Sequence, residues 1–162
     1  MTIQNLKTDA STQGAHAFIA DMRHYVAQAD PGPSGTKQFI WDISERYAYL
    51  CKKDLRDPIR FLKQAAGKPP IQFGTADFNP QLVDDENPAR HYTAFVFLGF
   101  FFAYPLAVIG LWLWEVAGFI RYKGQWSQRD ITCGYVGIRH GRQVRKHGPT
   151  VLPNLVADDL VA

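Results

Sequence analysis

Polar side chains that can carry out acid–base chemistry border a long uncharged run in the middle of this 162-residue chain. Arg90 and His91 precede the run, Glu115 ends it, and Asp130 lies further on. A histidine can act as a general base near neutral pH, and a carboxylate can orient its ring. We therefore expect Arg90, His91 and Glu115 to form a buried polar cluster, which Asp130 would extend. In this cluster His91 would be the base, Arg90 the ligand of an anion or carbonyl group, and Glu115 the group that orients His91.

Arg90 and His91 also have a structural interpretation. Asn87 and Pro88 favour the start of a helix, so both cations fall in its first turn. The helix dipole disfavours cations there by about 0.3 to 1 kcal/mol, which would keep His91 neutral and able to act as a base. Alternatively, Arg90 pairs with the acidic residues 84–86 just upstream, and His91 only caps the fold.

Glu115 needs a partner if it is buried. Its neighbours Trp114 and Val116 are apolar, and an unpaired carboxylate among apolar groups is costly. In one continuous helix, at about 1.5 Å per residue, His91 and Glu115 would lie roughly 36 Å apart and could not share a site. A hairpin turn at Pro105 would bring them together, because proline interrupts a helix.

The uncharged run from Tyr92 to Trp114 permits two interpretations. It exceeds the roughly 20 residues that cross a bilayer, and Gly99, Ala103 and Ala107 repeat as in closely packed membrane helices. A single span at about residues 92–114 would leave the basic C-terminal third in the cytoplasm. Alternatively, the run is the centre of a helical domain and is apolar all round because protein covers every side. The sequence leaves both interpretations open.

Apolar residues recur at three- and four-residue spacings in several segments, which predicts amphipathic helices. We expect helices over residues 12–29, from Thr36 to about residue 53, from Pro58, on both sides of Pro105, and from Ser127 to Lys146, with an ordered loop over residues 67–83. The predicted fold class is all-α: a compact bundle of about five to six helices around a central apolar hairpin broken at Pro105. One domain, residues 12–149, would lie between a flexible N-terminus, residues 1–11, and a C-terminal tail, residues 150–162.

The last predicted helix begins at a recognisable cap. Ser127, followed three residues later by Asp130, is close to a capping box, so capping alone would explain Asp130. His140 lies toward the other end of this helix, where a cation is favoured, and we assign it no part in the polar cluster.

Composition and motifs exclude several common classes of protein. Cys51 and Cys133 are too far apart in the chain for a local metal knuckle or redox pair. Gly-rich phosphate loops, nucleophile elbows and zinc-protease motifs are missing, so we predict no metal-binding or cofactor-binding residues. Residues 1–10 lack the apolar segment of a secretory signal peptide.

Basic residues dominate the C-terminal third, which suits a solvated helix face, a surface for anionic lipid, or a nucleic-acid footprint. They are Arg121, Lys123, Arg129, Arg139, Arg142, Arg145 and Lys146. We predict no specific nucleic-acid site, and the residues identify neither a cofactor nor an oligomeric state.

A resemblance rests on the segment from Phe73 to Phe78, which begins Phe-Gly, and on Asn87, Arg90 and His91, spaced as Asn-x-x-Arg-His. Over about residues 73–140 this pattern resembles bacterial helical domains of polymorphic toxins and secreted effector-like proteins. The resemblance implies an all-α domain with a polar set at the matching positions, namely Asn87, Arg90, His91, Glu115 and Asp130. It also implies a bacterial protein that is cytoplasmic or is secreted without a signal peptide, with a membrane or envelope substrate and a cognate protein partner.

Three functions are compatible with these features. The first is a toxin- or effector-like hydrolase in which Arg90, His91 and Glu115, extended by Asp130, act on an envelope substrate. The second is a non-catalytic inner-membrane protein with a single span and a basic segment against anionic lipid. The third is a helical immunity or adaptor module in which an Arg90–Glu115 contact is purely structural. The sequence leaves open whether the chain is an enzyme.

Overall fold

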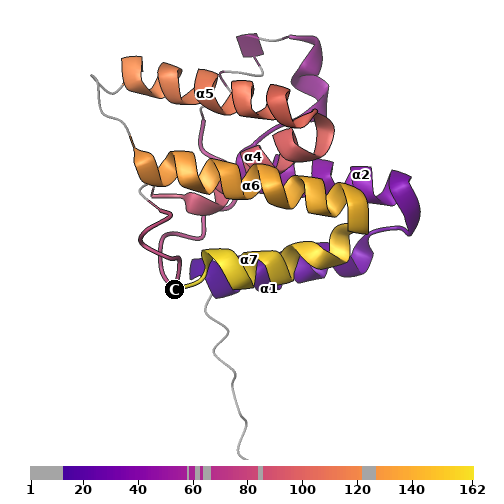
Figure 1. Ribbon diagram of the computed structural model, residues 1–162. Coiled ribbons are helices and arrows are strands. Elements are labelled where there is room, and N and C mark those ends of the chain that lie inside the picture. Colours follow the sequence, from indigo (N-terminus) through magenta and orange to yellow (C-terminus); the bar gives the residue numbers. More distant parts are fainter. Residues whose placement is uncertain (1–12, 58, 61–62, 64–66, 84–85, 122–126) are drawn as a thin grey trace, which may run out of the picture.

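The computed structural model describes residues 13–57, 59–60, 63, 67–83, 86–121 and 127–162, and these residues form an all-α fold (Figure 1). Its α-helices are α1 (Gly14–Gln28), α2 (Gly32–Ile43), α4 (Pro88–Phe101), α5 (Tyr104–Arg121), α6 (Gln128–His147) and α7 (Leu152–Leu160). Short turns of π-helix, η1 (Ser44–Ala48), and of 3-10 helix, η2 (Lys52–Arg56) and η3 (Pro149–Val151), also occur, and residues 59, 60 and 63 are helical. The predicted all-α fold is confirmed. The predictions for residues 1–11 and 84–85, and most of the helix predicted from Pro58, lie outside the described residues.

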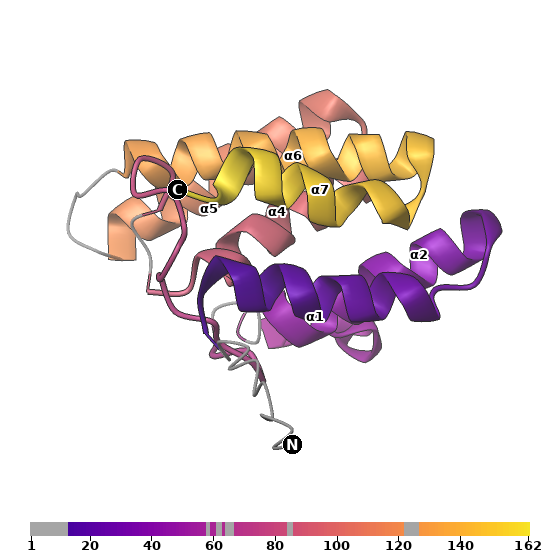
Figure 2. The same cartoon turned by 90° about the horizontal axis from the view of Figure 1, so that it is seen from below.

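Helix α4 occupies the centre of the arrangement. It lies between α6 on one side and α1 and α2 on the other (Figure 2). Helix α6 in turn lies between α5 and α7, and α7 packs against α1 (Figure 1). Segments from both ends of the chain therefore enclose α4.

Aromatic rings form the core between α1, α2 and α4. Phe18 of α1 is completely buried, and its ring centroid lies 5.1 Å from that of Tyr47, 5.3 Å from that of Phe73 and 6.1 Å from that of Tyr92. Edge-on and tilted pairs of this kind are favourable because the positive ring edge meets a negative ring face. Phe73 comes from the loop over residues 67–83, which contains no helix, as the sequence predicts. The amphipathic stripes of the N-terminal half thus share one core with α4.

The uncharged run is divided between two helices. Helix α4 ends at Phe101, Phe102 is extended, and α5 begins at Tyr104, so Pro105 stands in the first turn of α5. A proline is tolerated there because the first amides of a helix lack an intrahelical acceptor anyway. The predicted break near Pro105 is confirmed. Among the described residues, no helix combines the length and the apolar character needed to cross a membrane.

The two halves of the run differ in their surroundings. Helix α4 is buried along most of its length, as the sequence predicts for a central helix. Helix α5 is covered on one face only by the described residues: Ala107 and Leu111 are completely buried, whereas Leu106 and Leu113 are 57% and 67% exposed. The expectation that protein covers the run on every side holds for α4 and is wrong for α5.

Glycines allow α4 and α6 to approach until their backbones touch. A Cβ atom built on Gly137 of α6 would lie 2.8 Å from the carbonyl oxygen of Tyr92, and one on Gly141 would overlap the carbonyl oxygen of Val96. In the opposite direction, a Cβ atom on Gly99 of α4 would overlap the backbone of Ile138. Only hydrogen fits at these positions, because a backbone carbonyl cannot move aside as a flexible side chain can.

Residues 150–162 differ from the prediction of a tail. They form most of η3 and all of α7, in which Leu152, Val156 and Leu160 are completely buried. The amide of Asn79 donates a hydrogen bond of 2.8 Å to the carbonyl oxygen of Leu160. The helical domain therefore includes the last residues of the chain, since these apolar side chains cover α1.

Helix α2 begins one turn earlier than predicted. It starts at Gly32 with a proline in its first turn, and the hydroxyl of Thr36 donates a hydrogen bond of 3.0 Å to the carbonyl oxygen of Gly32. Thr36 is therefore inside the helix and does not cap it. Proline has a backbone angle that already suits the first turn, which explains the earlier start.

The glycine contact can be tested by comparing two Gly→Ala substitutions. Gly141→Ala should destabilise the protein by roughly 1 to 3 kcal/mol, because the methyl group forces α4 and α6 apart. Gly118→Ala in α5, where no described atom lies within 4 Å of the added Cβ, should instead stabilise it by about 0.5 to 1 kcal/mol through helix propensity. Urea unfolding of both variants measures the difference. If Gly141→Ala and Gly118→Ala were equally stable, the fold would not require the close approach of α4 and α6.

Candidate functional site

His91 lies in the first turn of α4 and is 9% exposed. Its Nε2 atom is 2.8 Å from the backbone carbonyl oxygen of Asp130, and its ring packs on Phe95 with centroids 4.8 Å apart. A carbonyl oxygen only accepts, so Nε2 donates this hydrogen bond. In a neutral His91 the lone pair is therefore on Nδ1, which is the nitrogen that can take up a proton.

Asp130 occupies the first turn of α6. Its amide donates a hydrogen bond of 3.1 Å to the hydroxyl of Ser127, the residue that caps the helix, so the predicted cap is confirmed. The carboxylate lies where the dipole of α6 favours negative charge. Asp130 thus has a structural role at the helix start, and its carbonyl group also positions the His91 ring.

Glu115 is buried on the inner face of α5, where it is 8% exposed. Burial raises the pKa of Glu115 to about 7, and the negative charge of Asp130 acts in the same direction. A carboxyl group in this environment exchanges its proton near neutral pH, as general acids and bases do.

The structure links two of the predicted site residues to a third. His91 and Glu115 belong to different helices, yet His91 hydrogen-bonds to the backbone of Asp130 and the charge of Asp130 acts on Glu115. The break between α4 and α5 makes this possible, as the hairpin prediction required. The group observed to hold Nε2 of His91 is the carbonyl of Asp130, where the sequence predicted the carboxylate of Glu115.

The other two members of the polar set lie beside this site. Arg90 is half-buried in the same turn as His91, and consecutive positions on a helix do not face each other. Asn87 is buried at the N-cap position of α4, and its side chain makes no capping hydrogen bond. In the described parts of the chain, no three His, Cys, Asp or Glu side chains are placed to hold a metal ion.

A second polar network joins α4, α6 and α7 and was missed from the sequence. The ring of His140 is completely buried, with Nδ1 2.8 Å from the hydroxyl of Tyr92 and Nε2 2.8 Å from a carboxylate oxygen of Asp159. Burial lowers the pKa of His140, although the hydrogen bond to Asp159 opposes this shift. In the neutral ring Nε2 donates to Asp159, and Nδ1 accepts from Tyr92. No spacing in the sequence indicates this network, because its members are far apart in the chain.

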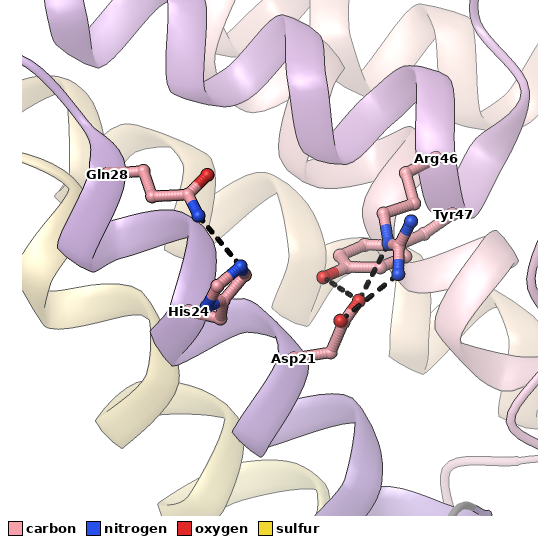
Figure 3. A network of polar contacts seen from close by, with 5 residues as sticks. All are labelled: Asp21, His24, Gln28, Arg46 and Tyr47. Carbon is pink, nitrogen blue, oxygen red and sulfur yellow. Dashed lines mark hydrogen bonds and ion pairs between the residues drawn. The ribbon is translucent and has the colours of Figure 1, made fainter.

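A third network holds α1 against η1 (Figure 3). Nε of Arg46 donates to Asp21 over 2.8 Å, and the hydroxyl of Tyr47 donates to the same carboxylate over 2.9 Å. The guanidinium of Arg46 also lies over the ring of Tyr25, 5.3 Å from its centroid. Burial, reinforced by the charge of Asp21, raises the pKa of the Tyr47 phenol well above its ordinary value, so Tyr47 stays a donor. Each group has a partner, which is the pattern of a structural clamp.

No protein-family model matches this chain, and neither a characterised protein sequence nor a solved structure is significantly similar to it. The resemblance to bacterial toxin- and effector-like domains therefore stays a prediction.

The raised pKa of Glu115 makes stability depend on pH. The ordinary pKa of this carboxyl is 4.5 and the folded value is about 7, so the folded state binds the proton more tightly. The free energy of unfolding should therefore fall as pH rises through this window. Glu115→Gln removes the effect and should be more stable than the wild type by on the order of 2 kcal/mol at about pH 8, with little difference at about pH 5. Urea unfolding at both pH values tests this, and a difference that does not change with pH would contradict it.

Proposed function

We propose that this chain is a helical module that binds the surface of a lipid bilayer through the outer face of α5. The observation that carries the proposal is a continuous row of exposed apolar side chains on that helix, here called the α5 stripe. Its members are Leu106 (57% exposed), Ile109 (53%), Leu113 (67%), Val116 (43%) and Ile120 (75%). Monomeric soluble proteins rarely expose an apolar surface of this extent without a binding role.

Helical geometry explains why the stripe points outward. Ala107, Leu111 and Glu115, spaced by four, are buried on the inner face of α5. The stripe recurs at alternating spacings of three and four on the opposite side, as one face of a helix does. Helix α5 lies at the edge of the molecule (Figure 1), and the stripe runs from Leu106 to Ile120, about 21 Å along this 18-residue helix.

The free energy available from the α5 stripe suits reversible binding. Full burial of an aliphatic side chain contributes about 1.5 to 3 kcal/mol, and these side chains are already roughly half covered, so each offers about 1 kcal/mol. The five together supply several kcal/mol, in the range of an interfacial helix that lies in the plane of a membrane.

The shape and border of the stripe favour a bilayer over a protein partner. The stripe lies along one helix, and a fluid bilayer receives such a helix face without a complementary pocket. Trp112, 43% exposed, borders it with an amphipathic ring of the kind that concentrates at membrane interfaces. At the start of the helix Arg142 lies beside Tyr104, and this cation suits anionic headgroups.

Vesicle co-sedimentation of the full chain tests the proposal. The wild type should bind vesicles that contain phosphatidylglycerol. Ile109→Ser/Leu113→Ser should weaken partitioning roughly 20-fold or more, from about 1 kcal/mol for each side chain. Ile59→Ser is a matched control, since Ile59 is 68% exposed outside α5, and it should bind as the wild type does.

Two outcomes would overturn the proposal. One is that the Ile59→Ser control loses as much vesicle binding as Ile109→Ser/Leu113→Ser. The other is no vesicle binding by a wild type that forms dimers in analytical ultracentrifugation, if Ile109→Ser/Leu113→Ser dissociates them. The second outcome would assign the α5 stripe to a protein interface.

A second candidate function is the toxin- or effector-like hydrolase suggested by the sequence. Two observations support it: His91 is held by the backbone carbonyl of Asp130, and the pKa of Glu115, on which the charge of Asp130 acts, is raised to about 7. In this candidate His91 takes up a proton on Nδ1 while the Asp130 carbonyl holds Nε2, and Glu115 is the proton-exchanging partner.

The hydrolase candidate predicts loss of activity without loss of fold. His91→Gln and Glu115→Gln should each abolish growth inhibition when the chain is exported to a bacterial periplasm. In the His91→Gln variant the new side-chain amide keeps a donor for the Asp130 carbonyl, so the melting temperature should change little. His16→Gln, at an exposed histidine of α1, should remain fully active. Inhibition that persists in both site variants would refute catalysis by this cluster.

A further inference from the structure

A groove of about 690 Å³ lies between the start of α5 and the end of α6. Its lining is made of two short segments: Phe102, Ala103, Tyr104 and Arg142, Gln143, Arg145, Lys146. Among the described residues, the lining therefore contains three cationic side chains and no carboxylate. Such a groove selects an anion on charge alone.

The start of α5 adds to the positive potential of the groove. The N-terminus of a helix carries about half a positive charge, and Ala103, the residue before α5, has no side chain that can cap it. The C-terminal end of α6 contributes about half a negative charge, which is small beside three full positive charges. The net charge around the groove is therefore strongly positive.

The arginines of the groove suit a phosphate group. The guanidinium of Arg142 lies 5.1 Å from the ring centroid of Tyr104, and this contact holds it at the groove. Arginine presents a planar fork of donors that matches two phosphate oxygens at once, and Arg145 offers a second fork from the next turn of α6.

The lining of the groove also has an apolar part. Phe102 and Tyr104, 43% and 46% exposed, line it together with the cationic side chains of α6. A ligand that contacts both kinds of side chain needs an anionic group joined to an apolar part. Among bilayer components, an anionic phospholipid has this form.

We propose that the groove binds the phosphate-bearing headgroup of an anionic lipid in the bilayer on which the α5 stripe rests. This inference rests on the proposed function and deepens it: the stripe supplies attachment, and the groove supplies the preference for anionic lipid. Arg142, Arg145 and Lys146 contact the phosphate, while the apolar part of the lipid lies against Phe102 and Tyr104.

The test compares full-chain variants on vesicles of phosphatidylcholine with and without phosphatidylglycerol. Wild-type binding should increase when phosphatidylglycerol is present. Arg142→Gln/Arg145→Gln should reduce binding to the anionic vesicles about 25-fold, from about fivefold for each charge, and leave binding to the neutral vesicles unchanged. All the substituted side chains are exposed, so the fold should be retained. Arg23→Gln/Lys53→Gln removes two exposed cations outside the groove and should have little effect.

The remaining outcomes separate this inference from the proposed function. Equal binding to neutral and anionic vesicles would overturn the headgroup site while leaving attachment through the α5 stripe intact. The headgroup site would also be overturned if Arg23→Gln/Lys53→Gln lost as much binding to anionic vesicles as Arg142→Gln/Arg145→Gln. The attraction would then depend on the overall charge of the protein and not on the groove. Glycerol phosphate at the same concentration as the phosphatidylglycerol is a competitor. If it displaced the protein from the vesicles, the ligand would be a soluble phosphate ester and the lipid assignment would be overturned. No binding to any vesicle would overturn both proposals.

Discussion

The close approach of α4 and α6 is the constraint on which the rest of the structure depends. Gly99, Gly137 and Gly141 let the two backbones meet, so the register between the helices is fixed by contacts that tolerate no added atom. This register aligns His91 with the carbonyl of Asp130 and Tyr92 with His140. A pair of helices separated by ordinary side chains would stand about 8 to 10 Å apart, and neither hydrogen bond would follow from the packing. These two hydrogen bonds are therefore consequences of the glycine contact.

The position of α5 follows from the same pair of helices. One face of α5 packs on them through Ala107 and Leu111 and brings Glu115 near Asp130, while the described residues leave the other face uncovered. Two properties of one helix thus arise together: a carboxyl group with a pKa near neutrality on the inside and the α5 stripe on the outside. The two candidate functions use opposite faces of α5. Catalysis would use the inner face and membrane attachment the outer face, so variants of one face leave the other intact.

Much of the local structure could be predicted from the sequence because short-range chemistry decides it. Ser127 caps α6, Pro88 starts α4, and the chain breaks just before Pro105. The convergence of His91 and Glu115 was a conditional prediction that depended on this break. Two features were missed. Residues 150–162 were predicted to be a tail, although Leu152, Val156 and Leu160 recur at a spacing of four, and His140 resembles an ordinary cation near a helix end until Tyr92 and Asp159 enclose it.

The sequence by itself determined that this chain is helical, where α1, α4 and α6 begin, and which residues have the chemistry for a site. These properties depend on neighbours within one or two turns, which are readable from spacing and residue type. Only the tertiary structure decided which apolar helix is buried. Helices α4 and α5 are alike in composition, yet α4 is enclosed and α5 presents the α5 stripe on its outer face. The physical reason is that burial depends on which other elements reach a surface, and this is a property of the packing rather than of the segment.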